Sequence, residues 1–358
     1  MPHLLLAVTA HGFGHLAQSA PVVAALARRL PELRVTLQSD IDPGFARRRL
    51  PPGFTQLHEA TDPGLVMAGP LVTRWAESLA AYRDFAAGYD RRLARQLATL
   101  RDLAPDLVLS DVPWLPLEAA QRLGIPAVGL CSFTWYDILR ECPPRDQVPA
   151  ALLDHLRLVY GATDRFIRPV PAMPLHWLPQ VQTVGPIAQR RPDRRAELRQ
   201  RFGCPADRPL ALMQFGGFAG LDPLRAWPEQ DQVHWLVQDL GGRPRRDATA
   251  LADHGLDVLD VLGSVDLILG KPGYGTYAEA ACNGVAVLHV PRDDWPEAAA
   301  LDAWLSGQVP CRTLSLADLA AGRVAGPIAA LLAAGRPTPV APSGIEEAAE
   351  LLEPYLRG

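Results

Sequence analysis

The sequence predicts an α/β fold of two Rossmann-like domains, each built on a parallel sheet. The chain has 358 residues, which is more than one ordinary hydrophobic core holds. Short apolar runs alternate with segments of helical periodicity in both halves, and this alternation is typical of parallel sheets with helical crossovers. A proline-rich stretch at 169–186 indicates a linker. We expect domains over 1–186 and 187–342, and a C-terminal helix within 343–358 that packs back towards the first domain.

In the first half, the apolar runs predict buried parallel strands at 4–9, 34–38, 55–58, 106–110 and 127–130. Helical spacing predicts helices at 16–30, 65–103 with a break near Gly88, and 115–123. In the second half, the same patterns predict strands at 210–214, 233–237, 267–269 and 285–290, and helices at 276–283 and 344–356. Two such domains would face each other across a cleft, with the carboxyl ends of both sheets at its walls.

Composition excludes several classes of protein. The net charge of −4 gives no basic surface for nucleic acid, so no nucleic-acid partner is expected. No apolar run reaches the roughly 20 residues that span a bilayer, and the first residues do not resemble a signal peptide, so a cytoplasmic location is expected. The five cysteines are scattered without a CxxC pair, which argues for reduced thiols and against a structural zinc site.

The loop after the first strand contains Gly12, Gly14 and His15 just before a helix. A histidine at this place suits a general base that deprotonates a hydroxyl group. The alternatives are that His15 only caps or packs against the loop, that it binds a metal with His11, or that the glycines hold a nicotinamide dinucleotide. Asp111, at the end of a buried strand, would orient such a histidine, or else cap the helix that follows.

The second half carries two glycine-containing strand ends. Gly216 and Gly217 follow one strand and offer successive amides, a weak sign of an anion site. The stronger segment follows the strand at 267–269, where a helix expected to open near Thr276 would present its amides to a diphosphate. The predicted binding residues of this segment are Lys271, Gly273, Tyr274, Gly275, Thr276 and Glu279. Glu279 would accept hydrogen bonds from a ribose, form a capping box with Thr276, or do both.

Acidic and aromatic residues complete the pattern. Asp293, Asp294 and Glu297 surround a tryptophan after the strand at 285–290, which suits recognition of sugar hydroxyls, although a charged surface turn is the alternative. Aromatic residues of the first half would line a partly apolar acceptor pocket or belong to the core; they are Trp75, Tyr82, Trp114, Phe133, Trp135 and Tyr136.

These motifs resemble the GT-B glycosyltransferases, and most of all the branch that holds the lipid II N-acetylglucosamine transferase and the small-molecule UDP-glycosyltransferases. The Gly-Phe-Gly-His loop at 12–15 is nearer still to the amino-terminal half of plant L-arabinokinases. The sugar-kinase half of those enzymes is absent from this sequence, so kinase activity is not implied. The sequence departs from the family pattern at Lys271-Pro272-Gly273, where His-Gly-Gly is common, and at Asp293-Asp294-Trp295, where the family has Asp-Gln or Glu-Gln.

The resemblance implies GT-B architecture and transfer of a sugar from a nucleotide-diphosphate sugar, UDP- or dTDP-linked, to a small-molecule or lipid-linked acceptor. His15 would be the base, Asp111 its support, and Gly14 part of the loop. Neither a catalytic metal nor a resident cofactor is expected. The alternatives are a nucleotide-sugar hydrolase or epimerase of the same fold, and a non-catalytic protein that binds nucleotide sugars.

Overall fold

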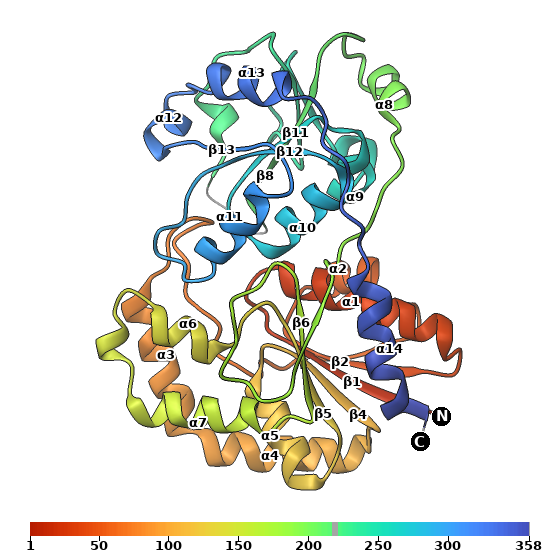
Figure 1. Cartoon of the computed structure of the whole chain (residues 1–358), viewed down its shortest axis with the longest axis vertical. Coiled ribbons are helices and arrows are strands. Elements are labelled where there is room, and N and C mark those ends of the chain that lie inside the picture. Colours follow the sequence, from red (N-terminus) through yellow and green to blue (C-terminus); the bar gives the residue numbers. More distant parts are fainter. Residues whose placement is uncertain (217–220, 358) are drawn as a thin grey trace. The chain divides into compact units, whose positions relative to one another are not determined.

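The computed structural model describes residues 1–216 and 221–357 and divides the chain into two compact units. Unit 1 comprises Met1–Ile187, Asp294–Ala300 and Ser343–Gly358, and unit 2 comprises Ala188–Asp293 and Leu301–Pro342. Two segments from late in the sequence therefore belong to the first unit. Figure 1 shows the last of them, in dark blue, beside the red amino-terminal helix.

Unit 1 is built on a seven-stranded sheet in the order β3-β2-β1-β4-β5-β6-β7, and every neighbouring pair is parallel. Its strands are β1 (His3–Val8), β2 (Arg34–Gln38), β3 (Thr55–Leu57), β4 (Leu107–Asp111), β5 (Ala127–Leu130), β6 (Arg165–Pro169) and β7 (Val181–Val184). Its helices are α1 (Gly14–Arg29), α2 (Pro43–Arg49), α3 (Trp75–Ala87), α4 (Tyr89–Leu103), α5 (Trp114–Leu123), α6 (Trp135–Glu141), α7 (Ala150–Gly161) and α14 (Gly344–Arg357).

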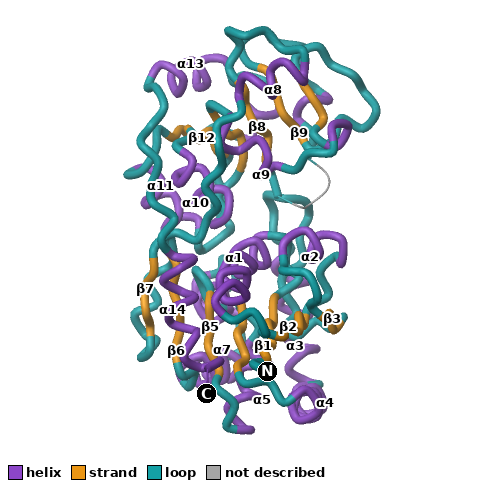
Figure 2. Tube along the Cα trace, turned by 90° about the vertical axis from the view of Figure 1, so that its right-hand side faces the viewer, coloured by secondary structure: helices purple, strands orange, loops and turns teal. Residues whose placement is uncertain are grey.

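Unit 2 repeats this plan with six parallel strands in the order β10-β9-β8-β11-β12-β13. Its strands are β8 (Leu210–Gln214), β9 (His234–Val237), β10 (Ala248–Ala250), β11 (Leu267–Gly270), β12 (Ala286–His289) and β13 (Cys311–Thr313). Its helices are α8 (Arg195–Phe202), α9 (Val258–Val261), α10 (Tyr274–Asn283), α12 (Leu316–Ala320) and α13 (Ala325–Ala333), together with most of α11 (Ala298–Ser306). Figure 2 shows the orange strands of each unit with purple helices around them.

The two parallel sheets confirm the predicted fold class. All six residues of β1 and all four of β11 are buried, because a parallel strand is covered on both faces, and His3 is the one polar residue among these ten. The predicted break near Gly88 is also confirmed, since α3 ends and α4 begins at this residue. The helix expected from residue 65 begins only at Trp75.

The interpretation of 169–186 as a linker was wrong. Residues Val181–Val184 form β7, which pairs in parallel with β6 at the edge of the unit 1 sheet. Pro179 and Pro186 stand on either side of this strand, outside its ladder, and an edge strand tolerates such neighbours. The chain leaves unit 1 just after it, between Ile187 and Ala188.

The C-terminal helix α14 packs along α1 within unit 1, as both figures show. Its buried residues recur on one face, at Gly344, Ala348, Leu352 and Leu356. On the other side of this contact, Arg29 of α1 donates hydrogen bonds to three carboxylates of α14, namely those of Glu346, Glu350 and Glu353. Among the described residues, no helix is both long and apolar enough to cross a membrane.

Candidate active site

The candidate residues lie at the two places where the order of strands reverses. In unit 1 this switch point is between β1 and β4, and in unit 2 it is between β8 and β11. Loops from adjacent strands diverge there, one to each face of the sheet, and leave a crevice at the carboxyl edge. His15 follows β1 and Asp111 ends β4, while Gly216 follows β8 and Lys271 follows β11.

The structure brings His15 and Asp111 into direct contact. Nδ1 of His15 donates a hydrogen bond to Oδ1 of Asp111 across 2.9 Å. Asp111 is completely buried, whereas the side chain of His15 keeps 12% of its surface exposed. Because Nδ1 carries the shared proton in this arrangement, Nε2 has the lone pair and can accept a proton.

The structure decides between the two predicted roles of Asp111, which were to orient His15 or to cap the following helix. The helix after β4 has Pro113 at its N-cap position and no side-chain cap, so Asp111 does not cap it. His15 does not cap α1 either, because the N-cap residue of α1 is Phe13. Both side chains instead form a dyad.

Neighbouring carboxylates raise the proton affinity of His15. Burial lowers the pKa of His15, but the charge and hydrogen bond of Asp111, with the charges of Glu297 and Asp62, outweigh it and raise the pKa above its usual value. Burial raises the pKa of Asp111, although the charge of His15 opposes this. The carboxylate thus stabilises the imidazolium that forms when His15 accepts a proton.

A second buried carboxylate lies near the dyad. Asp62 accepts hydrogen bonds from the hydroxyl of Thr9 at 2.8 Å and from the indole nitrogen of Trp135 at 2.6 Å. Burial raises the pKa of Asp62 to about 6. The hydrogen bonds from Trp135 and Thr9 and the charge of His15 lower this pKa, but burial outweighs them. No sequence motif points to Asp62, which stands in an irregular segment of the chain.

A third carboxylate comes from the segment Asp294–Ala300 of unit 1. Glu297 is buried, and its Oε1 accepts a hydrogen bond from the hydroxyl of Ser132 at 2.6 Å. Trp295 stacks on the ring of His11, with 6.0 Å between ring centres. Asp294 accepts a hydrogen bond from the backbone nitrogen of Thr73 at 2.7 Å. Asp293, by contrast, is exposed and belongs to unit 2, so the predicted sugar-reading acids are divided between the units.

Most of the aromatic residues predicted near an acceptor belong to the core of unit 1. Tyr82, Trp114, Phe133 and Trp135 are at most 2% exposed, and Tyr136 is also buried, whereas Trp75 is half-buried against this core. Phe133 nevertheless touches the ring of His15 edge-on, at 5.4 Å between centres. These rings therefore form an apolar wall behind the dyad.

Cys131 adds a third polar atom beside the dyad, with its Sγ 3.8 Å from Nδ1 of His15. In the described part of the chain, the group of potential metal ligands that meets here is His15, Asp111 and Cys131, whose ligand atoms lie within 4.8 Å of one another. His11 is not a member of this group, because its Nδ1 accepts a hydrogen bond from the backbone of Leu65. The structure therefore does not bring His11 and His15 together as metal ligands, as one predicted alternative required.

In unit 2, the loop after β11 ends at the N-terminus of α10. This helix begins at Tyr274, two residues earlier than predicted, with Gly273 as its N-cap residue. Its first intrahelical bond runs from the amide of Tyr277 to the carbonyl of Gly273. The amides of Tyr274, Gly275 and Thr276 therefore precede the helical ladder, which is the arrangement that binds phosphate groups. Thr276 is not the N-cap residue, so the capping box with Glu279 is ruled out.

The glycines at these loops differ in what the fold requires of them. A Cβ at Gly270 would lie 2.5 Å from the carbonyl oxygen of Gln214, so packing within unit 2 demands glycine there. A Cβ at Gly14, Gly273 or Gly275 would meet no described atom within 4 Å, and none of the three has a positive φ. Neither backbone conformation nor packing explains why these three positions are glycine. The close approach of a ligand to the backbone would explain it, because a side chain would block such an approach.

Lys271 lies beside Gly216 within unit 2. A Cβ at Gly216 would stand 3.5 Å from Cε of Lys271, and the φ of 82° at this residue also favours glycine. The structure therefore brings a cationic side chain to the switch point between β8 and β11. Gly217, the other half of the predicted glycine pair, lies outside the described residues. Glu279 stands in the second turn of α10 and is half-buried.

Comparison with known proteins gives two curated relatives, while no family model matches. The chain is 27% identical over 311 residues to an L-arabinokinase of Arabidopsis thaliana, an alignment that covers 82% of this chain and 29% of the kinase. It is 24% identical over 207 residues to an uncharacterized glycosyltransferase of Methanopyrus kandleri, covering 53% of this chain and 58% of that protein. The chain thus spans less than two thirds of either relative.

Solved structures match over nearly the whole chain. The calicheamicin glycosyltransferase CalG4 superposes with a TM-score of 0.62 at 19% identity, covering 100% of this chain and 98% of that one. A Phytolacca americana glycosyltransferase complexed with UDP-2-fluoro-glucose and pterostilbene gives a TM-score of 0.59 at 16% identity, covering 100% and 94%. The two Rossmann-like sheets and these matches together assign the chain the GT-B fold of glycosyltransferases.

Proposed function

We propose that this protein is a glycosyltransferase that moves a sugar from a nucleotide-diphosphate sugar to a hydroxyl group of an acceptor. The hydrogen bond between His15 and Asp111 at the unit 1 switch point carries the proposal. A buried carboxylate that fixes one nitrogen of a partly exposed histidine is the arrangement of a general base. The GT-B fold and the glycosyltransferase relative support the same reaction class.

In the proposed reaction, the acceptor hydroxyl attacks the anomeric carbon of the donor sugar. Its proton passes to Nε2 of His15, while Asp111 holds Nδ1 and stabilises the imidazolium. The bond between the anomeric carbon and the diphosphate oxygen breaks, and the nucleotide diphosphate leaves with the electron pair. His15 then releases its proton to solvent.

Unit 2 would bind the donor. The amides at the start of α10 and the hydroxyl of Thr276 would hold the diphosphate, with Lys271 supplying a positive charge. Glu279 would accept hydrogen bonds from the ribose. These groups offset the charge of the leaving diphosphate, so we infer a mechanism that needs no metal ion.

We infer a UDP- or dTDP-linked donor and a small-molecule or lipid-linked acceptor. The Phytolacca americana neighbour was crystallised with a UDP-sugar analogue, and the neighbour VinC was crystallised with dTDP. Asp293 and Asp294 remain the candidates for contact with the sugar hydroxyls.

The test is release of UDP or dTDP from a panel of nucleotide sugars, with and without pterostilbene as a phenolic probe acceptor. We expect nucleotide release and a glycosylated product with one donor, and His15→Ala should lower turnover by roughly 10²–10⁴. Cys131→Ser, which alters the neighbour of the dyad and keeps His15, is the matched variant and should retain most of the turnover.

Other outcomes would replace this function. Donor consumption at the same rate without any acceptor, and with free sugar as product, would identify a hydrolase, and conversion to an isomeric nucleotide sugar would identify an epimerase. Tight nucleotide binding with no turnover of any donor would identify a binding protein. A folded His15→Ala variant with unchanged turnover would remove His15 from the mechanism.

A further inference from the structure

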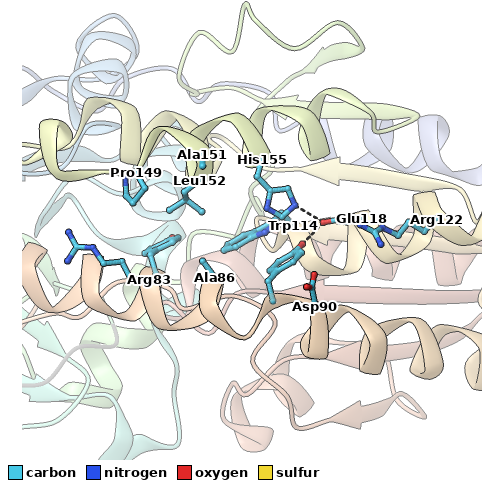
Figure 3. A pocket seen from close by; sticks show the side chains of 12 residues that line it. Arg83, Ala86, Asp90, Trp114, Glu118, Arg122, Pro149, Ala151, Leu152 and His155 are labelled. Atoms are coloured by element: carbon cyan, nitrogen blue, oxygen red, sulfur yellow. Dashed lines mark hydrogen bonds and ion pairs between the residues drawn. The ribbon is translucent and has the colours of Figure 1, made fainter.

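Unit 1 contains a cavity of about 480 Å³ that involves none of the residues of the dyad. It lies between the junction of α3 and α4, the helix α5, and the start of α7, as Figure 3 shows. Its volume falls within the range of small-molecule sites, roughly 300–1,000 Å³.

The floor of this cavity is aromatic and apolar. Tyr82 and Trp114 stack with 6.0 Å between ring centres and 7° between ring planes, and both are buried. Leu152 of α7 faces them, and Ala86 of α3 completes the apolar part. A flat apolar ring suits the space above this floor, where Leu152 and Ala86 line the cavity.

A preorganised hydrogen-bonding group stands at one end of the cavity. Oε2 of Glu118 accepts hydrogen bonds from the hydroxyl of Tyr89 at 2.5 Å and from Nε2 of His155 at 2.8 Å, while Oε1 accepts one from Arg122 at 2.6 Å. The pKa of this carboxyl is lowered to about 2, because the hydrogen bonds from His155 and Tyr89 outweigh burial, so Glu118 is ionised.

The ionised carboxylate fixes which nitrogen of His155 donates. A carboxylate only accepts hydrogen bonds, so Nε2 of His155 must donate, and in the neutral form of the ring Nδ1 carries the lone pair. Nδ1 makes no hydrogen bond to any described residue, and the side chain keeps 30% of its surface exposed. The ring of Tyr89 contacts it edge-on at 4.6 Å and holds it in place. In this neutral form His155 offers an acceptor that matches a hydroxyl group.

The opposite end of the cavity is cationic. Arg83 lies there beside Pro149, on the exposed rim. Its guanidinium donates one hydrogen bond, to the carbonyl of Gln147 at 3.3 Å, and forms no ion pair with a described carboxylate. Arg122, at the other end, is already paired with Glu118. The Arg83 end is thus suited to an anion.

We propose that this cavity is a second ligand site, which binds a flat aromatic carboxylate bearing a hydroxyl group. The ring would lie against Leu152 and Ala86, above the buried rings of the floor, the hydroxyl would donate to Nδ1 of His155, and the carboxylate would bind Arg83. The site is distinct from the dyad. Tyr82 of its floor contacts Trp135, Trp135 contacts Phe133, and Phe133 contacts His15, so buried aromatic rings lie between the cavity and the dyad.

The test uses calorimetric titration of the full chain with p-coumarate. We expect saturable binding of one molecule per chain. Cinnamate, which lacks the hydroxyl group, and the methyl ester of p-coumarate, which lacks the anion, should each bind roughly 10-fold more weakly. Arg83→Gln should weaken p-coumarate by a similar factor, whereas Arg91→Gln, on an exposed position of α4 outside the cavity, should not.

A second pair of variants tests the cavity itself. Ala86→Phe fills the cavity from its rim and should abolish binding, and Ala87→Phe, at the next exposed position of α3, should leave it unchanged. His15→Ala should bind p-coumarate as the native chain does, whatever becomes of glycosyl transfer. No saturation up to about 10 mM p-coumarate, which excludes even millimolar affinity, binding that persists in Ala86→Phe, or binding lost in His15→Ala would each overturn the proposal.

Discussion

At the scale of single residues, the shared proton of the dyad decides how the proposed activity depends on pH. His15 must be neutral to accept a proton, and its pKa lies above the usual 6.5 because of Asp111, Glu297 and Asp62. Turnover should therefore fall as the pH is lowered through a value above 6.5. Asp111→Asn removes the largest of the charges that raise this pKa.

For Asp111→Asn we expect two effects. The acidic limb of the kcat–pH profile should move to lower pH. The maximal kcat should fall by roughly 10²–10⁴, because the Asp111 carboxylate no longer stabilises the tautomer of His15 that has its lone pair on Nε2. The full profiles of both proteins provide the measurement. An acidic limb at an unchanged pH would show that His15 is not the group that titrates.

The glycines at the start of α10 permit a prediction that separates fold from binding. Gly275→Ala adds a methyl group where no described atom lies within 4 Å, so the free energy of unfolding should stay the same or rise by up to about 1 kcal/mol. The same methyl group would stand between the helix amides and a phosphate, and UDP affinity should fall about 10-fold, or 1.4 kcal/mol.

Gly270→Ala is the matched control for this prediction. Its methyl group would collide with the carbonyl of Gln214, and it should cost about 1–3 kcal/mol of stability. Thermal unfolding and UDP titration of both variants make the comparison. A Gly275→Ala chain that binds UDP as tightly as the native chain would contradict the phosphate role of this turn.

At the scale of elements, the start of α10 shows why helix boundaries are harder to predict than helices. The sequence predicted a helix opening near Thr276, since threonine is a common N-cap residue. The structure begins it at Tyr274 after Gly273 in an extended conformation, with no side-chain cap at all. A helix whose N-cap residue has no capping side chain can present its first amides to a ligand, and local capping preferences contain no information about a ligand.

The C-terminal helix gives the element-scale prediction. Leu352 is completely buried where α14 packs within unit 1, so Leu352→Ala should reduce the free energy of unfolding by about 2–5 kcal/mol. Leu351→Ala, at a half-buried position of the same helix, should cost clearly less. Chemical denaturation measures both. Equal small losses would indicate that α14 contributes little to unit 1.

At the scale of the whole molecule, the two units have separate cores and the proposed donor site lies in one of them. A nucleotide diphosphate that binds only the folded state should raise the free energy of unfolding by about 2.7 kcal/mol at 100 times its Kd. We expect this for UDP or dTDP in thermal unfolding, with the gain confined to the transition of unit 2. His15→Ala should leave the gain intact, and a gain that disappears in this variant would place the nucleotide elsewhere.

The sequence by itself determined the fold class, the position of most strands, and the two candidates His15 and Asp111. These features depend on local patterns, because buried parallel strands are mainly apolar along their length and chemistry at such sheets gathers at strand ends. Only the tertiary structure decided which side chains meet. The contact of His15 with Asp111 joins residues 96 positions apart, and the hydrogen bond of Ser132 to Glu297 joins residues 165 positions apart. No periodicity records such distances along the chain, so the role of Asp62, the contact of Glu297 with Ser132 and the cavity around Trp114 emerged only once the chain was folded.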